Sequence, residues 1–208
     1  MHFPSIAEPS TFQKGVQHVS RVDLRIRQLV ERQGLIKCNV GGDPFESLVR
    51  AIISQQLNGQ AAKSIFKKVA EATQSPINAQ SLLDLPVSKM RKNGLSPQKI
   101  RYLKDLSSRV IKGQLDLRSL KRRQDDDVIR ILDEVQGIGA WTAQMFLIFT
   151  LGRPDVLPVS DLGIRMAIKK TYSLRKLPEP EKINRIAQNW HPYCSIASLY
   201  LWRSKNTQ

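Results

Sequence analysis

The sequence predicts an all-α protein, and three features of its 208 residues support this fold class. Apolar residues recur along most of the chain at the i, i+3, i+4 spacing of one buried helix face. No alternating apolar and polar stretch is long enough to form a sheet, and the chain has no internal repeat. Apolar residues make up 41% of the chain and charged residues 25%, which is ordinary for a folded protein and argues against disorder.

The first half of the chain contains five predicted helices. The segment Leu24 to Val30 is expected to form a terminal helix, and Asp43-Pro44-Phe45-Glu46 combines an N-cap residue, a first-turn proline and a glutamate three residues after the cap. The helices after Asp43 are indicated by these apolar runs: Phe45, Leu48, Val49, Ile52 and Ile53; then, past the Asn58-Gly59 turn, Ala62, Ile65, Phe66 and Val69; then Leu82 to Gly94, as one short helix that ends at glycine; then Ile100, Leu103, Leu106, Val110 and Ile111.

The second half continues the helical pattern around one unusually apolar segment. Residues Trp141 to Leu151 are apolar on nearly all sides, which predicts a central buried helix. A proline-flanked loop from Pro154 to Pro158 follows, and Asp161 is placed to open the next helix. The remaining helices are indicated by Val128, Ile131, Leu132 and Val135, by Ile164, Ala167 and Ile168, and by the terminal segment Ile196 to Trp202.

The charge of the chain indicates a polyanionic partner. The sequence has 33 Lys and Arg residues against 18 Asp and Glu residues, which gives a formal net charge of +15. Basic side chains release condensed counterions when they meet phosphates, so this surplus favours nucleic-acid binding over a merely solvated basic surface. The cations form small groups such as Lys121 to Arg123 rather than one tail.

The cysteine count and the hydropathy pattern exclude several classes of protein. Cys38 and Cys194 alone cannot form a disulfide framework, a four-cysteine zinc site or an iron–sulfur cluster. No apolar stretch approaches the ~20 residues of a membrane-spanning helix. The first residues lack the basic-then-apolar layout of a secretory signal, so we expect an intracellular protein. His18 and His191 are isolated in the sequence, and neither is assigned a catalytic or metal-binding role.

The segment Val135 to Ala143 has the composition of a phosphate-binding turn between two helices. Gly137 can adopt a positive φ that ends the first helix, and Ile138 is expected to anchor the turn in the core. Gly139 leaves the backbone N–H groups at the start of the second helix uncovered. Those N–H groups and the positive end of the helix dipole form a candidate phosphate site that needs no side chain, and the alternative is a plain turn between two helices.

Three separated motifs occur in the order found in one family. Val135–Ala143 resembles the helix-hairpin-helix motif of the DNA glycosylase superfamily, Leu157–Gly163 resembles the loop that carries its catalytic aspartate, and Ala51–Leu57 resembles an upstream motif of the same superfamily. Together they resemble the alkylbase branch, the 3-methyladenine DNA glycosylase II type. The resemblance covers roughly Asp43 to Trp202.

The resemblance implies two helical subdomains with the active site in the cleft between them. We expect a central subdomain at residues 45–160, with the helix-hairpin-helix at residues 128–150. Residues 1–44 and 161–208 are expected to form the second subdomain from both ends of the chain. The implied partner is double-stranded DNA that contains damaged bases, bound by a monomer without a membrane contact, in the nucleoid of a bacterium or the nucleus of a eukaryote.

The resemblance assigns the catalytic role to Asp161. Cleavage of an N-glycosidic bond passes through an oxocarbenium-like sugar, which a fixed carboxylate stabilises, and the same group can activate the attacking water. An Asp with a reference pKa of ~3.9 is ionised at neutral pH, and the dipole of the following helix favours its charge. The alternative for Asp161 is a plain N-cap.

The residue at the start of the second hairpin helix distinguishes two mechanisms. Bifunctional relatives carry a lysine nucleophile there, whereas this chain has Trp141, so the resemblance implies simple hydrolysis without lyase activity. Trp141 and Trp202 match pocket tryptophans that stack on the flipped base, and Met145 and Tyr200 are further candidates for the pocket. The alternative for these residues is core packing.

The resemblance also implies DNA contacts and a cofactor expectation. Leu57 is the best candidate for a wedge that fills the gap left by the flipped base, with a helix-end core position as its alternative. No organic cofactor and no metal bound by side chains is expected, although the hairpin carbonyls of relatives can hold a monovalent cation. The full set of expected DNA contacts is Gln56, Leu57, Asn58, Gly137, Ile138, Gly139 and Thr142.

Three positions depart from the family pattern. Asn58 stands where many relatives have a small residue, which shifts the expected choice of lesion, and Ser160 replaces a common glycine. Cys194 stands where the family usually has an arginine. The absence of that arginine is expected to weaken the C-terminal subdomain or a phosphate contact. Two rival functions stay open: a weak or inactive homologue that binds damaged or abasic DNA, and a helical nucleic-acid-binding module unrelated to repair.

Overall fold

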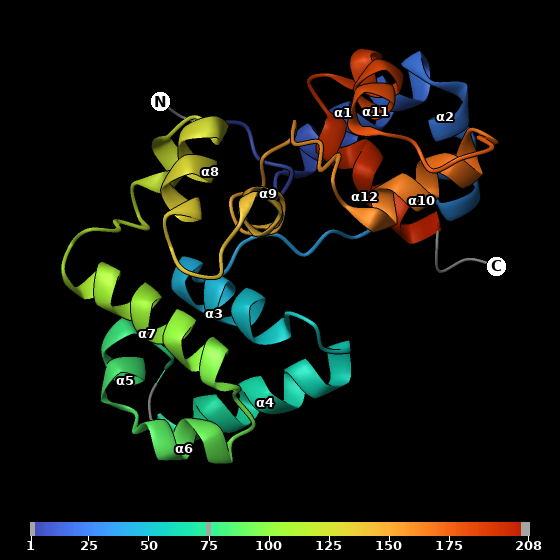
Figure 1. Ribbon diagram of the computed structural model, residues 1–208. Helices are drawn as coiled ribbons and strands as arrows, with labels where there is room; N and C mark the ends of the chain where they lie inside the picture. The colour runs from blue at the N-terminus through green and yellow to red at the C-terminus, as the bar shows by residue number, and fades with distance from the viewer. Residues whose placement is uncertain (1–2, 74–75, 205–208) are drawn as a thin grey trace. The chain divides into compact units, whose positions relative to one another are not determined.

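The computed structural model describes residues 3–73 and 76–204, and within these ranges the protein is helical without any strand (Figure 1). The predicted all-α class is therefore confirmed. The chain divides into two compact units: residues 42–146 form unit 2, and residues 1–41 together with 147–208 form unit 1. Both ends of the expected terminal subdomain, residues 1–2 and 205–208, lie outside the described residues. No helix in the described ranges has the length and apolar character needed to cross a membrane.

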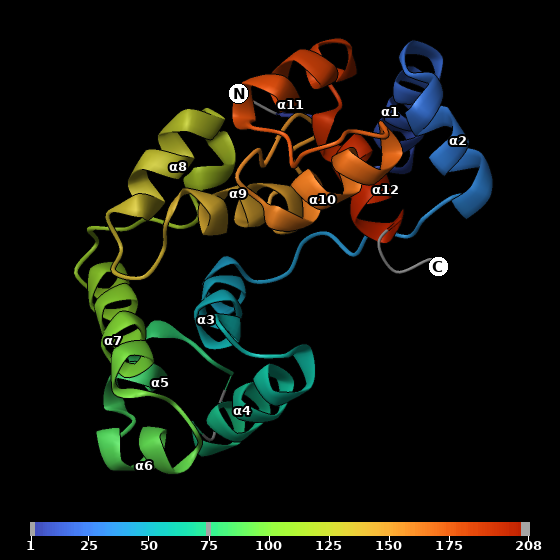
Figure 2. The same cartoon turned by 45° about the vertical axis from the view of Figure 1, so that its right-hand side comes forward.

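Unit 2 is organised around the long helix α7. Helix α7 contacts α3, α5 and α6, and α3 also packs against α4, as both views show (Figures 1 and 2). The elements of unit 2 are α3 (Pro44–Ser54), α4 (Gly59–Ala72), α5 (Ala79–Asp84), α6 (Val87–Lys92), α7 (Pro97–Ile111), the 3-10 helix η1 (Leu120–Arg122), α8 (Asp125–Asp133) and the first turns of α9 (Ala140–Phe149).

The start of α3 follows the sequence prediction, whereas the expected single helix from Leu82 to Gly94 is wrong. Asp43 caps α3 by accepting the Glu46 N–H at 2.8 Å, with Pro44 at the first helical position. Two helices, α5 and α6, replace the expected one because Leu85 is extended before Pro86, as the residue preceding a proline prefers. The ammonium of Lys104 occupies the break and donates to the carbonyls of Leu82, Leu83 and Leu85 at 2.6 to 2.9 Å.

Unit 1 joins both ends of the chain around the buried helix α12. Residues 194–201 of α12 are all buried, and α12 packs against α1, α2 and α10. Neither α1 nor α11 is among the helices predicted from the sequence. The elements of unit 1 are α1 (Pro9–Val22), α2 (Leu24–Gln33), the end of α9, α10 (Leu162–Thr171), α11 (Pro180–Ala187), the 3-10 helix η2 (Gln188–Trp190) and α12 (Cys194–Ser204).

A single carboxylate connects three elements of unit 1. Asp23 caps α2 by accepting the Arg25 and Ile26 N–H groups. Its other oxygen accepts the Tyr172 hydroxyl at 2.5 Å and the indole N–H of Trp190 at 2.9 Å. Burial and this carboxylate raise the pKa of Tyr172, so the tyrosine remains a hydrogen-bond donor at neutral pH.

The boundary between the units lies inside α9, whereas the sequence places it after residue 160. Residues 147–160 belong to unit 1 because the loop that follows α9 is hydrogen-bonded to the start of α12. The Ser195 N–H donates to the Pro154 carbonyl at 3.0 Å, and the Ser195 hydroxyl accepts the Val156 N–H at 2.9 Å. The same hydroxyl donates to the Arg153 carbonyl at 2.7 Å.

Candidate catalytic and DNA-binding residues

The Asp161 carboxylate is held by two donors at the start of α10. Its Oδ1 atom accepts the Ile164 N–H at 2.7 Å, which is the N-cap bond expected from the sequence. The same oxygen accepts the indole N–H of Trp202 at 2.8 Å. Because one donor comes from α10 and the other from α12, the carboxylate is fixed by two packed helices. The cap and the catalytic interpretation are therefore compatible.

Trp202 combines this hydrogen bond with an aromatic contact. Its ring packs against Phe149 at the end of α9, with a centroid distance of 5.7 Å and an interplanar angle of 33°. The side chain is partly exposed, as a pocket residue requires. The hydrogen bond from the Trp202 N–H also positions the Asp161 carboxylate. This role could not be predicted from the sequence, because the two residues are 41 positions apart.

Two further apolar side chains stand beside Asp161 and were also missed. Leu162 and Met166 are 59% and 48% exposed, and their spacing of four puts them on one face of α10. The buried face of α10 consists of Ile164, Ala167 and Ile168, as predicted. The available signal was that Leu162 and Met166 are apolar but lie off that buried stripe.

Tyr200 belongs to the core of unit 1. Its side chain is fully buried, and its hydroxyl donates to the Gly34 carbonyl at 3.2 Å. Its backbone carbonyl accepts the amide of Gln33 at 3.1 Å. Burial raises the pKa of Tyr200. A base cannot reach a ring in this position, so we assign Tyr200 to core packing.

Helix α9 has an apolar face that is only partly covered. Trp141, Met145 and Phe149 follow one another at intervals of four and therefore share this face. Trp141 is 45% exposed and Phe149 37% exposed, while Met145 is half-buried. The expectation of a buried helix holds for the opposite side, where Leu147 and other residues are fully buried. An exposed indole at the first turn of α9 favours binding over core packing for Trp141.

The turn before α9 has the geometry that its two glycines predict. Gly137 adopts a φ of +81°, and a Cβ there would lie 2.1 Å from the Tyr102 ring. Ile138 is 2% exposed, which confirms that it anchors the turn in the core. Around Gly139 a Cβ would have no neighbour closer than 4.0 Å, so the backbone at the start of α9 is accessible. Thr142 is buried, so its side chain does not reach the surface of unit 2.

The Gln55 to Asn58 turn is held to this hairpin by side-chain hydrogen bonds. The Gln55 amide donates to the Gly137 carbonyl at 2.7 Å. The Lys99 ammonium from α7 donates to the Ile53 carbonyl at 2.6 Å and the Gln55 carbonyl at 2.8 Å, and partial burial lowers its pKa. The end of α3 and the hairpin therefore form one connected structure within unit 2.

The three expected contacts on this turn have different positions. Gln56 is exposed and adopts a φ of +56°, which is uncommon for a residue with a side chain. Leu57 is 38% exposed, which favours the wedge over the core alternative. Asn58 caps α4 by accepting the Ala61 N–H at 2.8 Å. Strain at an exposed turn is typical of functional segments.

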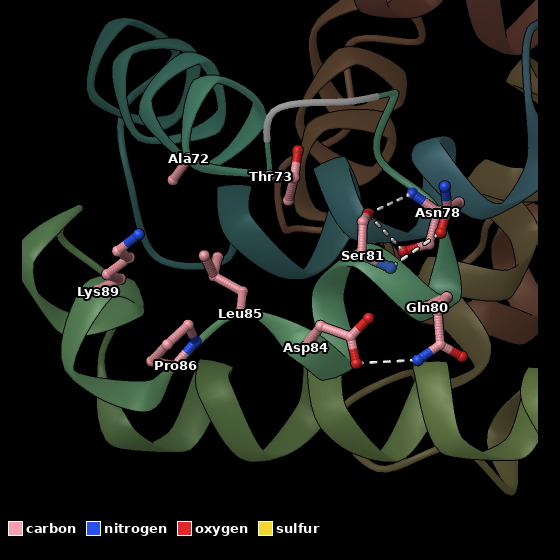
Figure 3. Close-up of a pocket in the computed structure, with 9 residues that line it drawn as sticks. All are labelled: Ala72, Thr73, Asn78, Gln80, Ser81, Asp84, Leu85, Pro86 and Lys89. Atoms are coloured by element: carbon pink, nitrogen blue, oxygen red, sulfur yellow. Dashed lines mark hydrogen bonds between the residues drawn. The ribbon is translucent and has the colours of Figure 1, made fainter.

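A polar pocket of about 400 Å³ near α5 is a separate feature (Figure 3). None of its nine described lining residues is aromatic. Asn78 and Ser81 form a reciprocal capping box at the start of α5, and the Gln80 amide donates to Asp84 at 2.9 Å. These polar groups are hydrogen-bonded to one another within α5 and its N-cap. The pocket lacks the stacking surface that a base needs.

Comparisons with known proteins identify the family of the chain. Residues 49–192 match the family model described as HhH-GPD superfamily base excision DNA repair protein. DNA-3-methyladenine glycosylase 1 of Schizosaccharomyces pombe is 32% identical over 194 residues, which are 90% of this chain and 85% of the relative.

Two solved structures share the fold over nearly the whole chain. The Schizosaccharomyces pombe 3-methyladenine DNA glycosylase in complex with abasic DNA has a TM-score of 0.83 and 30% identity, covering 93% of this chain and 97% of that one. The DNA-3-methyladenine glycosidase from Bacillus halodurans has a TM-score of 0.84 and 32% identity, covering 100% of this chain and 94% of that one. The chain therefore belongs to the HhH-GPD superfamily of base excision DNA repair proteins.

Proposed function

We propose that this protein is a monofunctional DNA glycosylase that hydrolyses the N-glycosidic bond of alkylated purines of the 3-methyladenine type in base excision repair. The observation that carries the proposal is the Asp161 carboxylate, which is fixed by the Ile164 and Trp202 N–H groups. It lies in a chain that is 32% identical to DNA-3-methyladenine glycosylase 1 of Schizosaccharomyces pombe. A carboxylate that does not reorganise during the reaction is the form of electrostatic catalysis that this bond cleavage needs.

In the proposed reaction one acidic residue both stabilises the sugar cation and activates the attacking water. Asp161 stabilises the oxocarbenium-like deoxyribose as the C1′–N bond breaks, and it orients or deprotonates the water that attacks C1′. O-glycosidases use a second carboxyl group to protonate the leaving group. An alkylated purine already carries positive charge and leaves as a neutral base, so a second acid is not required.

Recognition of the lesion is assigned to aromatic and apolar side chains. Trp141 is the main stacking surface for the flipped base because its indole is exposed. An indole face attracts a cationic methylated purine by ~0.5–2 kcal/mol more than a neutral base. The Trp202 N–H donates to Asp161, and its ring packs against Phe149. Trp202 therefore offers the base a ring edge and its other face. Met145 completes the proposed set.

Backbone and turn residues are assigned to the grip on duplex DNA. The N–H groups at the start of α9, next to Gly139, bind a phosphate, and Leu57 enters the gap left by the flipped base. Gln56 and Asn58 flank Leu57 in the minor groove. A monovalent cation on the hairpin carbonyls stays a prediction; the Gly137 carbonyl has one lone pair committed to the Gln55 amide. A protein with this function acts on chromosomal DNA, in the nucleoid of a bacterium or the nucleus of a eukaryote.

The proposal is tested with Asp161→Asn, using methylated DNA and mass spectrometry of the released bases. Asparagine keeps the N-cap and the shape, so the variant should fold and bind duplex while base release falls below detection. Asp126→Asn is the matched control, since Asp126 is an exposed aspartate on α8. Retained base release by the Asp161 variant would show that this carboxylate is not the catalytic group.

The same reactions separate the rival functions. The wild type should leave intact abasic strands and form no borohydride-trapped adduct, because Trp141 supplies no amine nucleophile. Lesion-specific binding without release of any base identifies the inactive homologue. Equal affinity for damaged and intact duplex identifies the unrelated nucleic-acid-binding module.

A further inference from the structure

Three metal-ligating side chains converge in unit 1, away from the groups used above. The Asp155 Oδ2 atom lies 2.8 Å from the Nδ1 atom of His191, and the Cys194 Sγ atom lies 3.6 Å from the same nitrogen. All three ligand atoms lie within 4.8 Å of one another. This cluster has no signature in the sequence, because His191 stands 36 residues from Asp155.

The fold brings the three residues together from separate segments. Asp155 lies in the loop between α9 and α10, His191 directly follows η2, and Cys194 is the first residue of α12. The imidazole of His191 turns its Nδ1 toward the other two ligand atoms. Because the His191 side chain is 55% exposed and that of Asp155 is 31% exposed, an ion from solvent can reach the cluster.

The charge on Asp155 has no permanent counterion. Within residues 3–73 and 76–204, Asp155 forms no ion pair with a lysine or arginine, and the His191 imidazole is its ion-pair partner. Asp155 uses its Oδ1 atom to accept the Cys194 N–H at 3.1 Å. Its Oδ2 atom is thereby directed at the histidine and is placed to act as a ligand.

The distances fit a zinc ion. With Zn–N of about 2.0 Å and Zn–S of about 2.3 Å, a tetrahedral angle separates nitrogen and sulfur by about 3.5 Å, close to the 3.6 Å observed. The Nδ1 to Oδ2 distance would have to widen by about 0.5 Å, because two such ligands of zinc lie about 3.3 Å apart. We propose that Asp155, His191 and Cys194 bind Zn²⁺, with water as the fourth ligand.

Thiolate, imidazole and carboxylate together select zinc over magnesium or calcium, which prefer oxygen ligands. When the ion binds, the Zn–S bond forms and the thiol proton passes to solvent. A nucleophilic role for Cys194 fits less well, since burial and Asp155 raise the pKa of this fully buried thiol. The bound ion would tie the start of α12 to the loop that leads to Asp161.

The test uses Co²⁺ as a spectroscopic substitute for Zn²⁺ in the full chain. The experiment is done in the Cys38→Ser background, so that Cys194 supplies the only thiol. One Co²⁺ per chain should produce the near-ultraviolet charge-transfer band that requires a cobalt–sulfur bond, and one equivalent of Zn²⁺ should remove it. Cys194→Ala should abolish the band.

Variants of His191 and Asp155 provide a second test, because these two side chains are exposed or partly exposed and neither belongs to the buried core. His191→Gln and Asp155→Asn should each weaken Zn²⁺ binding about tenfold or more. Loss of a group that only hydrogen-bonds to a metal ligand already weakens binding by about tenfold, and loss of a ligand itself should cost at least as much. Zn²⁺ should raise the thermal midpoint of the Cys38→Ser protein but not that of its His191→Gln form. Absence of the cobalt–thiolate band, or equal affinity in the His191 variant, would refute the site.

Discussion

At the scale of single residues, Trp202 connects the proposed base pocket to the proposed catalytic carboxylate. Its ring packs on Phe149, while its N–H donates to Asp161. A carboxylate at a helix start has other rotamers available, and a second donor from α12 restricts them. Supporting contacts of this kind hold a catalytic group within a few tenths of an ångström of its productive position.

Trp202→Phe separates these two roles, because phenylalanine keeps an aromatic ring on Phe149 and removes the N–H. The lost bond is made to an ionised group, and such bonds contribute about 1.5–3 kcal/mol. We expect the single-turnover rate of base release to fall about ten- to a hundredfold, while affinity for lesion duplex changes little. An equal loss in binding and rate would mean that the ring, not the N–H, is the important part.

At the scale of elements, the ammonium of Lys99 holds the end of α3 in place. It donates to two carbonyls that α3 leaves without helical partners, and Gln55 carries the connection on to the Gly137 carbonyl. Leu57 projects from the turn that these bonds fix. The position of the proposed wedge therefore depends on a side chain of α7.

Lys99→Met should loosen this turn without emptying space in unit 2. We expect unfolding free energy to fall by about 1–3 kcal/mol and lesion-duplex affinity to fall about tenfold, equivalent to about 1.4 kcal/mol. Denaturant unfolding and fluorescence anisotropy measure the two effects.

Lys104→Met is the matched control, because Lys104 also lies on α7 and donates to carbonyls at the end of a helix, here α5. It should cost similar stability and leave DNA binding unchanged. If both variants lose affinity equally, the effect is one of stability alone.

Elements with strong local signals could be predicted from the sequence. The Asp43 cap and the buried Ile138 depend on neighbouring residues, so the sequence pattern contains them. Helices α1 and α11 bury only a few residues each, among them Gly15 in α1, so the apolar stripe that could reveal them in the sequence is short. The expected helix through Pro86 failed because the apolar spacing continues across a residue that breaks the backbone pattern.

The candidate residues of the site could be named from the sequence, whereas the hydrogen bonds that join them could not. Asp161 follows from local pattern and resemblance, whereas its bond to Trp202 joins positions that only the packing of α12 against α10 brings together. The sequence leaves Tyr200 open between the base pocket and core packing, and its full burial supports core packing. An aromatic residue near the end of a buried helix gives no sequence sign of which way it faces. His191 looked isolated because its neighbours are distant in sequence.

At the scale of the whole molecule, the net charge of +15 is expected to set how tightly the protein holds any duplex. Each phosphate contact releases counterions, so the logarithm of the affinity falls linearly with the logarithm of salt concentration. The proposed stacking of a base on Trp141 and the proposed entry of Leu57 into the duplex would release no such ions. Affinity and discrimination should therefore respond differently to salt.

For about five phosphate contacts, we expect a slope of about −4.5 in a plot of log K against log salt concentration. Anisotropy titrations with intact duplex and with duplex carrying a stable abasic analogue should give parallel lines, because both DNAs have the same phosphates. Their separation measures lesion recognition, and it should persist when salt is raised. Lines that converge at high salt would mean that discrimination is carried by the basic surface instead of by the residues around Asp161 and the hairpin.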